Sequence, residues 1–176
     1  MDSEQSFNAT LSMFNTRVNL LERLHGKPAM ATISSFSGGF FTGKPQTLDH
    51  SSLLGMRAED QAVQGEPLRL HLRYTAGGYL LTLKNTGEHY NKLISKSWLD
   101  VFGARDPDTR NPTLFSLIDH QHNIITRKNI KSRHIPISLM TGNKKHVGGL
   151  RVRGSPYLYL AETDQQSKAM FILSIR

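Results

Sequence analysis

The chain has 176 residues, of which 38% are hydrophobic and 20% charged, values typical of one soluble globular domain and not of a disordered chain. It has no cysteine, which excludes a disulfide framework, a thiolate nucleophile and a thiolate metal site. The last third, residues 121–176, holds ten Lys and Arg against two acids, so this part accounts for the whole net charge of +8. Such an asymmetry favours an anionic partner.

Residues 6–25 are predicted to form one N-terminal amphipathic helix that ends at Gly26 and Pro28. Three roles are open for it: packing on the main domain, forming a homodimer, or inserting into a membrane as part of a small pore-former. We therefore expect two parts, the helix and its stop at 1–27 and a β domain at 28–176. The apolar stripe consists of Phe7, Leu11, Phe14, Val18 and Leu21.

After Pro28 the sequence changes to short alternating segments separated by Gly, Pro, Asn and Asp, the pattern of an all-β barrel or sandwich. The longest irregular stretch covers residues 98–112, where Asp-Pro and Asn-Pro pairs indicate turns. Twelve strands are predicted, at 29–36, 39–44, 52–58, 68–74, 79–84, 92–97, 113–118, 123–128, 135–140, 149–153, 157–162 and 170–175.

Two short patterns recur along this β region. Two apolar residues followed by Thr, any residue and Lys occur three times, with the threonines at Thr42, Thr82 and Thr126. Because side chains alternate between the two faces of a strand, the Thr and the Lys of each copy share a face, and the Lys can protect the end of its strand. The alternative interpretation is a threefold ligand site that uses these lysines. An alternating apolar strand follows each copy, at 67–72, 113–118 and 170–175.

Three units of four strands each resemble the β-trefoil superfamily, over Pro28 to Arg176. The resemblance implies a barrel capped by three hairpins, of a fascin-like or lectin-like kind. Members of this superfamily commonly act as recognition modules, so the resemblance implies binding and not catalysis.

No motif for catalysis accompanies these strands. The sequence has no G-x-S-x-G, no H-E-x-x-H and no Walker-type loop. Asp119, His120 and His122 form the one tight cluster of possible metal ligands, and no third histidine is close to them in the sequence. We therefore expect a protein that is not an enzyme and has neither cofactor nor metal.

The basic C-terminal third is the strongest functional signal. Arg forks and Lys point charges bind phosphates and sulfates, and growth-factor trefoils similarly bind sulfated glycans through a basic cluster in their last unit. We expect a non-enzymatic module whose basic patch binds a sulfated or acidic glycan or a phosphate-bearing surface; a merely solvated basic face is the alternative. The predicted site is Arg127, Lys128, Lys131, Arg133, Lys144, Lys145, Arg151 and Arg153.

A lectin or toxin-type receptor-binding protein, recognising neutral carbohydrate or a protein partner, is the second hypothesis. The Gln-x-Trp pattern of ricin-type lectins is missing, and Trp98 is the one tryptophan. No secretory signal or membrane-spanning run is recognisable, so we expect a cytoplasmic protein or export by another route. The alternative sugar-binding residues are Glu88, His89, Tyr90, Asn91, Tyr157 and Tyr159.

Overall fold

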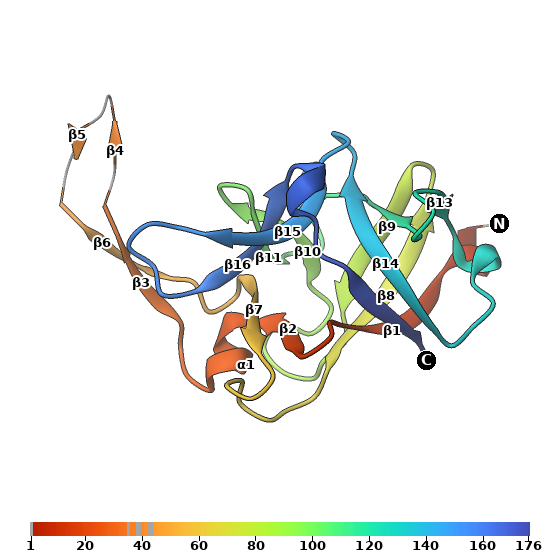
Figure 1. Cartoon of the computed structure of the whole chain (residues 1–176), viewed down its shortest axis with the longest axis horizontal. Coiled ribbons are helices and arrows are strands. Elements are labelled where there is room, and N and C mark those ends of the chain that lie inside the picture. Colours follow the sequence, from red (N-terminus) through yellow and green to blue (C-terminus); the bar gives the residue numbers. More distant parts are fainter. Residues whose placement is uncertain (1, 35, 38–39, 42–43) are drawn as a thin grey trace.

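A computed structural model describes residues 2–34, 36–37, 40–41 and 44–176, with side chains described for 4–34 and 44–176. The protein is all-β, with a strand-rich body and a ribbon that projects from it (Figure 1). The first half contains η1 (Asp2–Gln5), β1 (Phe7–Ser12), β2 (Thr16–Leu20), α1 (Leu21–His25), β3 (Met30–Ile33), β4 (Phe36–Ser37), β5 (Phe40–Phe41), β6 (Gln46–Asp49), β7 (Leu54–Ala58), β8 (Leu68–Thr75) and β9 (Gly78–Leu83). The second half contains β10 (Leu93–Trp98), β11 (Val101–Arg105), β12 (Phe115–Ile118), β13 (Ile124–Ile125), η2 (Arg127–Asn129), β14 (His134–Thr141), β15 (His146–Arg151), β16 (Leu158–Thr163), η3 (Gln165–Ser167) and β17 (Phe171–Ile175).

Nine of the described strands form a closed antiparallel barrel. The hydrogen-bonded order is β1, β8, β9, β10, β11, β16, β15, β14 and β17, and β17 pairs with β1 to close the ring. Strand β12 pairs with both β9 and β14, which creates a shorter closed circuit of β1, β8, β9, β12, β14 and β17. The pair β2–β7 joins the barrel through β16. Closure leaves few unpaired edges in the body.

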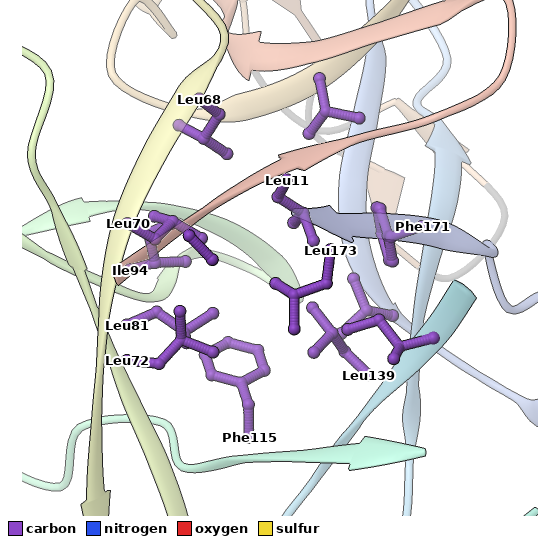
Figure 2. Close-up of a cluster of buried hydrophobic side chains, with 14 of the residues drawn as sticks. Leu11, Leu68, Leu70, Leu72, Leu81, Ile94, Phe115, Leu139, Phe171 and Leu173 are labelled. Carbon is purple, nitrogen blue, oxygen red and sulfur yellow. The ribbon is translucent and has the colours of Figure 1, made fainter. Parts of the chain in front are cut away.

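Alternating apolar residues fill the barrel interior. In β8, Leu68, Leu70 and Leu72 point inward and are almost fully buried, and Arg69 between them is exposed. Figure 2 shows these leucines converging with Leu11 of β1 and side chains of other barrel strands. The remaining internal space is about 10 Å³, too small for a ligand. This part of the barrel interior therefore has no room for a ligand.

The predicted N-terminal helix is wrong. Residues 6–25 contain β1, a turn, β2 and the five-residue helix α1, and only the predicted stop at Gly26, which has φ 68°, is confirmed. Phe7 and Leu11, spaced by four, fit a period of two as well as one of 3.6, and Ala9 between them is also buried. The ring needs a strand between β8 and β17, and this tertiary pairing overrides the helical pattern.

The loss of the helix removes the basis for two further predictions. Phe7, Leu11, Val18 and Leu21 are buried inside the protein, so they do not form a stripe for a helical homodimer or a membrane-inserting helix. Phe14, in the β1–β2 turn, is 81% exposed and is the one member of the stripe that faces solvent.

Most predicted strands are confirmed within a few residues, and seventeen strands are present among the described residues. β6 and β11 were not predicted, the segment 29–36 contains two strands, and β13 is only two residues long. The first Thr-x-Lys motif contains Thr42, which lies outside the described residues. Thr82 is in barrel strand β9, whereas Thr126 precedes η2 as its N-cap, so these two threonines are not in equivalent positions.

The projecting ribbon consists of two small sheets, β3–β6 and β4–β5 (Figure 1). Hydrogen bonds fix its base: His50 N donates to Ala29 O at 2.7 Å, and Ala29 N donates to Ser51 Oγ at 2.9 Å. The Tyr157 hydroxyl donates to Met30 O at 3.3 Å. The base of the ribbon is therefore attached to the strand pair β15–β16 of the body.

Candidate anion-binding pocket

A surface pocket of about 610 Å³ lies near the base of the ribbon. Four separate parts of the chain form it: the start of β2, the end of α1 with the residues after it, strand β7 with the residues after it, and the connection from β15 to β16. Its lining residues are Thr16, His25, Lys27, Met56, Arg57, Ala58, Gln61, Arg151, Pro156, Tyr157 and Leu158.

The lining contains four basic side chains, His25, Lys27, Arg57 and Arg151, and no carboxylate among the described residues that form it. Gly26 adopts the left-handed conformation that ends α1, and this turn brings Lys27 to the pocket. Such a concentration of one sign of charge in a concave surface raises the local concentration of anions.

Backbone carbonyl groups position the two arginines. Arg57 Nη1 donates to Leu24 O at 3.2 Å, and Arg151 Nη1 donates to Pro156 O at 3.4 Å. Each of these bonds uses one N–H of a guanidinium group that has five. The arginines are thus oriented by the fold while several N–H groups of each remain suited to phosphate or sulfate oxygens.

Burial and two neighbouring cations both act on His25 in this pocket. Burial lowers the pKa of His25 below its ordinary value of 6.5, and the charges of Arg57 and Lys27 lower it further. The His25 ring also contacts the Tyr157 ring edge-on, with centroids 4.9 Å apart. The imidazole is therefore neutral at pH 7, and a bound anion would favour its protonated form.

Apolar side chains form most of the remaining lining, together with the polar Thr16 and Gln61. Met56 and Tyr157 are buried, and Leu158 is half-buried beside them. Ligand sites commonly combine an apolar surface with a few polar groups that fix orientation. The pocket therefore suits an anionic group attached to a larger body.

The structure does not bring the eight predicted basic residues to one place. The first four, Arg127 to Arg133, lie on η2 and in the segment leading to β14. Lys144 and Lys145 follow the other end of β14, and eight residues of strand separate the two groups by roughly 26 Å. Arg151 lines the pocket, and Arg153 is in the β15–β16 connection.

Sequence reasoning missed three of the four basic residues in the pocket lining, His25, Lys27 and Arg57. All three lie in the first 120 residues, where acidic residues balance the Lys and Arg residues. No local signal distinguishes them, because the pocket exists only where α1, β7 and β15 meet. Only Arg151 belonged to the predicted basic set.

The alternative sugar-binding residues are also dispersed. Tyr157 and Tyr159 are buried, and the Tyr159 hydroxyl is hydrogen-bonded to His50 Nδ1 at 2.7 Å and to Ser155 Oγ at 2.6 Å. Neither ring offers an open face to a sugar. Tyr90 is 49% exposed, and Lys84 Nζ lies 5.1 Å from its ring centroid.

The other residues of that turn have partners of their own. Asn91 Oδ1 accepts a hydrogen bond from Lys84 Nζ at 2.6 Å, and His89 Nε2 lies 3.4 Å from Glu22 Oε1. Glu88 is exposed beside them. This turn therefore packs against α1 and is separate from Tyr157 and Tyr159.

The Asp119 cluster is a turn stabilised by its own backbone. Asp119 Oδ1 accepts hydrogen bonds from the amides of Gln121 and Asn123, both at 2.9 Å, and these bonds lower the pKa of the carboxyl group. His122 adopts φ 65° in the same turn. Within the described part of the chain, no three His, Asp or Glu side chains are grouped so that they could hold a metal ion.

Comparison with protein-family models, with curated proteins and with solved structures finds no match. Among the described residues, no helix is both long enough and apolar enough to cross a membrane.

Proposed function

We propose that this protein is a β-trefoil recognition module that binds a phosphate- or sulfate-bearing ligand in the pocket formed by His25, Lys27, Arg57 and Arg151. One observation carries this proposal: four basic side chains from three segments of the chain converge on one concavity whose described lining includes no carboxylate. The role is binding, and it does not require a catalytic step.

The strand pairing supports the trefoil assignment. The six-strand circuit and three hairpin-like pairs, β2–β7, β10–β11 and β15–β16, correspond to the barrel and caps of a trefoil. Each unit then has four strands, and the recurrent apolar strands at 67–72, 113–118 and 170–175 coincide largely with the last strand of each unit, β8, β12 and β17. The first unit would begin at β1, earlier than the predicted Pro28, and the ribbon interrupts it between β2 and β7.

The chemistry of the lining supports an anionic ligand. Guanidinium groups donate paired N–H groups to the oxygens of phosphate or sulfate, and Lys27 adds a point charge. Burial lowers the pKa of His25, and the charges of Arg57 and Lys27 lower it further, as expected for an imidazole that lies beside these two cations. Of the eight basic residues predicted from the sequence, the proposed site retains only Arg151. His25, Lys27 and Arg57 take the place of the other seven.

Retention on heparin resin tests the proposal with two double variants of equal charge change. The variant Lys27→Glu/Arg151→Glu reverses two pocket charges, and Lys131→Glu/Arg133→Glu reverses two exposed charges before β14. We expect the pocket variant to elute at clearly lower salt and the control to elute close to the unchanged protein. A hydrogen bond to a charged group contributes about 1.5–3 kcal/mol, so the pocket variant should also bind inorganic pyrophosphate at least tenfold more weakly.

Two results would contradict this assignment. Equal losses in both variants would indicate a general charge effect with no defined site. A loss confined to Lys131→Glu/Arg133→Glu would place the site at the segment before β14. Histidine NMR gives a local check, since pyrophosphate should raise the pKa of His25 in the unchanged protein.

A further inference from the structure

The ribbon differs in composition from the rest of this basic protein. Residues 28–43 contain no charged side chain, although 20% of the whole chain is charged, and they include three phenylalanines, Phe36, Phe40 and Phe41. The strands β4 and β5 that contain these phenylalanines pair with each other, with Phe36 opposite Phe41 in register. Figure 1 shows β4 and β5 as the part of the ribbon farthest from the barrel.

A two-stranded ribbon of this kind gains little stability by itself. Isolated hairpins are marginally stable in water, and both β3–β6 and β4–β5 are two-stranded sheets that pair with no other described strand. Phenylalanine is a residue type that favours transfer from water to an apolar or interfacial environment. An uncharged, phenylalanine-rich end is therefore suited to a partner that offers such an environment.

The base of the same ribbon is surrounded by cations. Lys27 precedes the ribbon by two residues and lines the pocket with Arg57 and Arg151. Arg153 is next to Gly154, where an added Cβ would lie 3.0 Å from Thr32 O of β3, so this turn packs against the ribbon. Lys44 lies between β5 and β6 and is exposed, and Asp49 at the end of β6 is the one acid in the described part of the ribbon.

We infer that the partner is an anionic lipid bilayer: the β4–β5 end inserts into the interface, and the cationic pocket binds the phosphate of a lipid headgroup. This inference rests on the proposed anion-binding function. Apolar insertion and attraction of basic residues to anionic lipids act together in membrane-surface binding, and each Lys or Arg near the surface adds to it. A soluble polyanion would use the cations but not the uncharged end.

Insertion is shallow, for a physical reason. The outer edges of a two-stranded ribbon carry backbone N–H and C=O groups that are not paired within the ribbon, and these groups are not tolerated in the hydrocarbon interior. The ribbon end therefore stays at headgroup depth, where water satisfies its edges. The protein lies on the membrane surface and does not span it.

Vesicle flotation of the full chain tests this inference, with phosphatidylcholine vesicles and with vesicles of phosphatidylcholine and phosphatidylserine at 7:3 (about 30% anionic, a composition chosen to give a negative surface). We expect binding to the anionic vesicles and much weaker binding to the neutral ones. Phe40→Ser/Phe41→Ser should lower affinity about a hundredfold, since each phenylalanine transferred from water contributes about tenfold. Phe14→Ser, which replaces an 81% exposed phenylalanine in the β1–β2 turn, is the matched control and should bind normally.

A second measurement locates the ribbon directly. In Phe41→Trp, the added tryptophan fluorescence should shift to shorter wavelength with anionic vesicles and should be quenched by lipids brominated near the headgroup. The single natural Trp98 is in β10 and supplies the background signal in the unchanged protein. An unshifted spectrum with vesicles present overturns the insertion.

The outcomes separate this inference from the proposed function. Pyrophosphate and heparin binding through Lys27 and Arg151, combined with no vesicle binding, would refute the lipid partner and leave the anion site intact. Vesicle binding that is equal for neutral and anionic lipid, and unaffected by Lys27→Glu/Arg151→Glu, would refute the anionic-headgroup assignment. Failure of the unchanged protein to bind pyrophosphate would refute the pocket function. Self-association that Phe40→Ser/Phe41→Ser abolishes, without vesicle binding, would identify a second copy as the partner instead.

Discussion

Replacing Tyr159 with Phe tests the buried hydrogen bonds that link Tyr159 to His50 and Ser155 near the base of the ribbon. The Tyr159 ring is fully buried, and its hydroxyl makes two short hydrogen bonds, 2.7 Å to His50 Nδ1 and 2.6 Å to Ser155 Oγ. The backbone amide of His50 donates to Ala29 at the start of the ribbon. The substitution changes almost no volume, so the loss reports the polar contacts.

The expected magnitude follows from these contacts. Two hydrogen bonds contribute about 1 kcal/mol each, and leaving His50 Nδ1 buried without a partner costs a further ~1–3 kcal/mol. Because His50 Nε2 already has no hydrogen-bond partner among the described residues, the ring would have none at either nitrogen. We expect the free energy of unfolding to fall by about 3–5 kcal/mol, which lowers Tm by roughly 6–20 °C in a protein of this size.

Urea unfolding followed by circular dichroism measures this change. Tyr90→Phe is the matched control, because Tyr90 is 49% exposed and its replacement should alter stability by less than about 0.5 kcal/mol. In a double-mutant cycle with His50→Leu, we expect a coupling energy of about 1 kcal/mol or more. A Tyr159→Phe change no larger than that of Tyr90→Phe would refute the reasoning.

Three further predictions concern pH and packing. Burial lowers the pKa of His25, His50, His71 and His146 below 6.5, so the stability that their neutral forms contribute is complete above pH 6.5 and is lost as the pH falls. The urea concentration at the unfolding midpoint should therefore decrease from about pH 8 to about pH 5. A midpoint that stays constant would contradict this prediction. Since a bound anion favours protonated His25, affinity for inorganic sulfate, measured calorimetrically, should rise as pH falls from about 7.5 to about 5.5, and His25→Gln should remove that dependence. Gly148→Ala would place Cβ 2.1 Å from the backbone oxygen of Ser167 and should destabilise by about 3 kcal/mol in thermal unfolding, whereas Gly142→Ala, with no atom within 4 Å, should have little effect.

The β strands of the body were largely predictable because their apolar residues alternate. The segment "LRLHLRY" predicts a half-buried strand, and β8 has that strand's buried and exposed residues in the expected order. Strand β11 was missed because Asp-Pro and Asn-Pro pairs dominate the stretch around it, although Val101 and Phe102 are fully buried. Local periodicity thus predicted the class of fold and most of its strands.

The N-terminal segment shows the limit of that method. Apolar residues four apart satisfy the periods of both a helix and a strand, and the sequence alone has no information on which partner is available. The ring of the barrel requires a strand between β8 and β17, and residues 7–12 fill that position. The strands that pair with β1 lie about 60 residues (β8) and about 160 residues (β17) away along the chain, so no local pattern identifies them.

The candidate site depends even more on such distant contacts. Composition established that the protein is basic and that an anionic partner is favoured, and this follows from counting charges. Which cations act together depends on Lys27, Arg57 and Arg151, which are far apart in sequence and meet because β7 and β15 both pair with β16 near the end of α1. Strand register over long separations is a property of the folded barrel. It brings Lys27, Arg57 and Arg151 into one pocket with the neutral His25, and it places the eight predicted basic residues in separate parts of the fold.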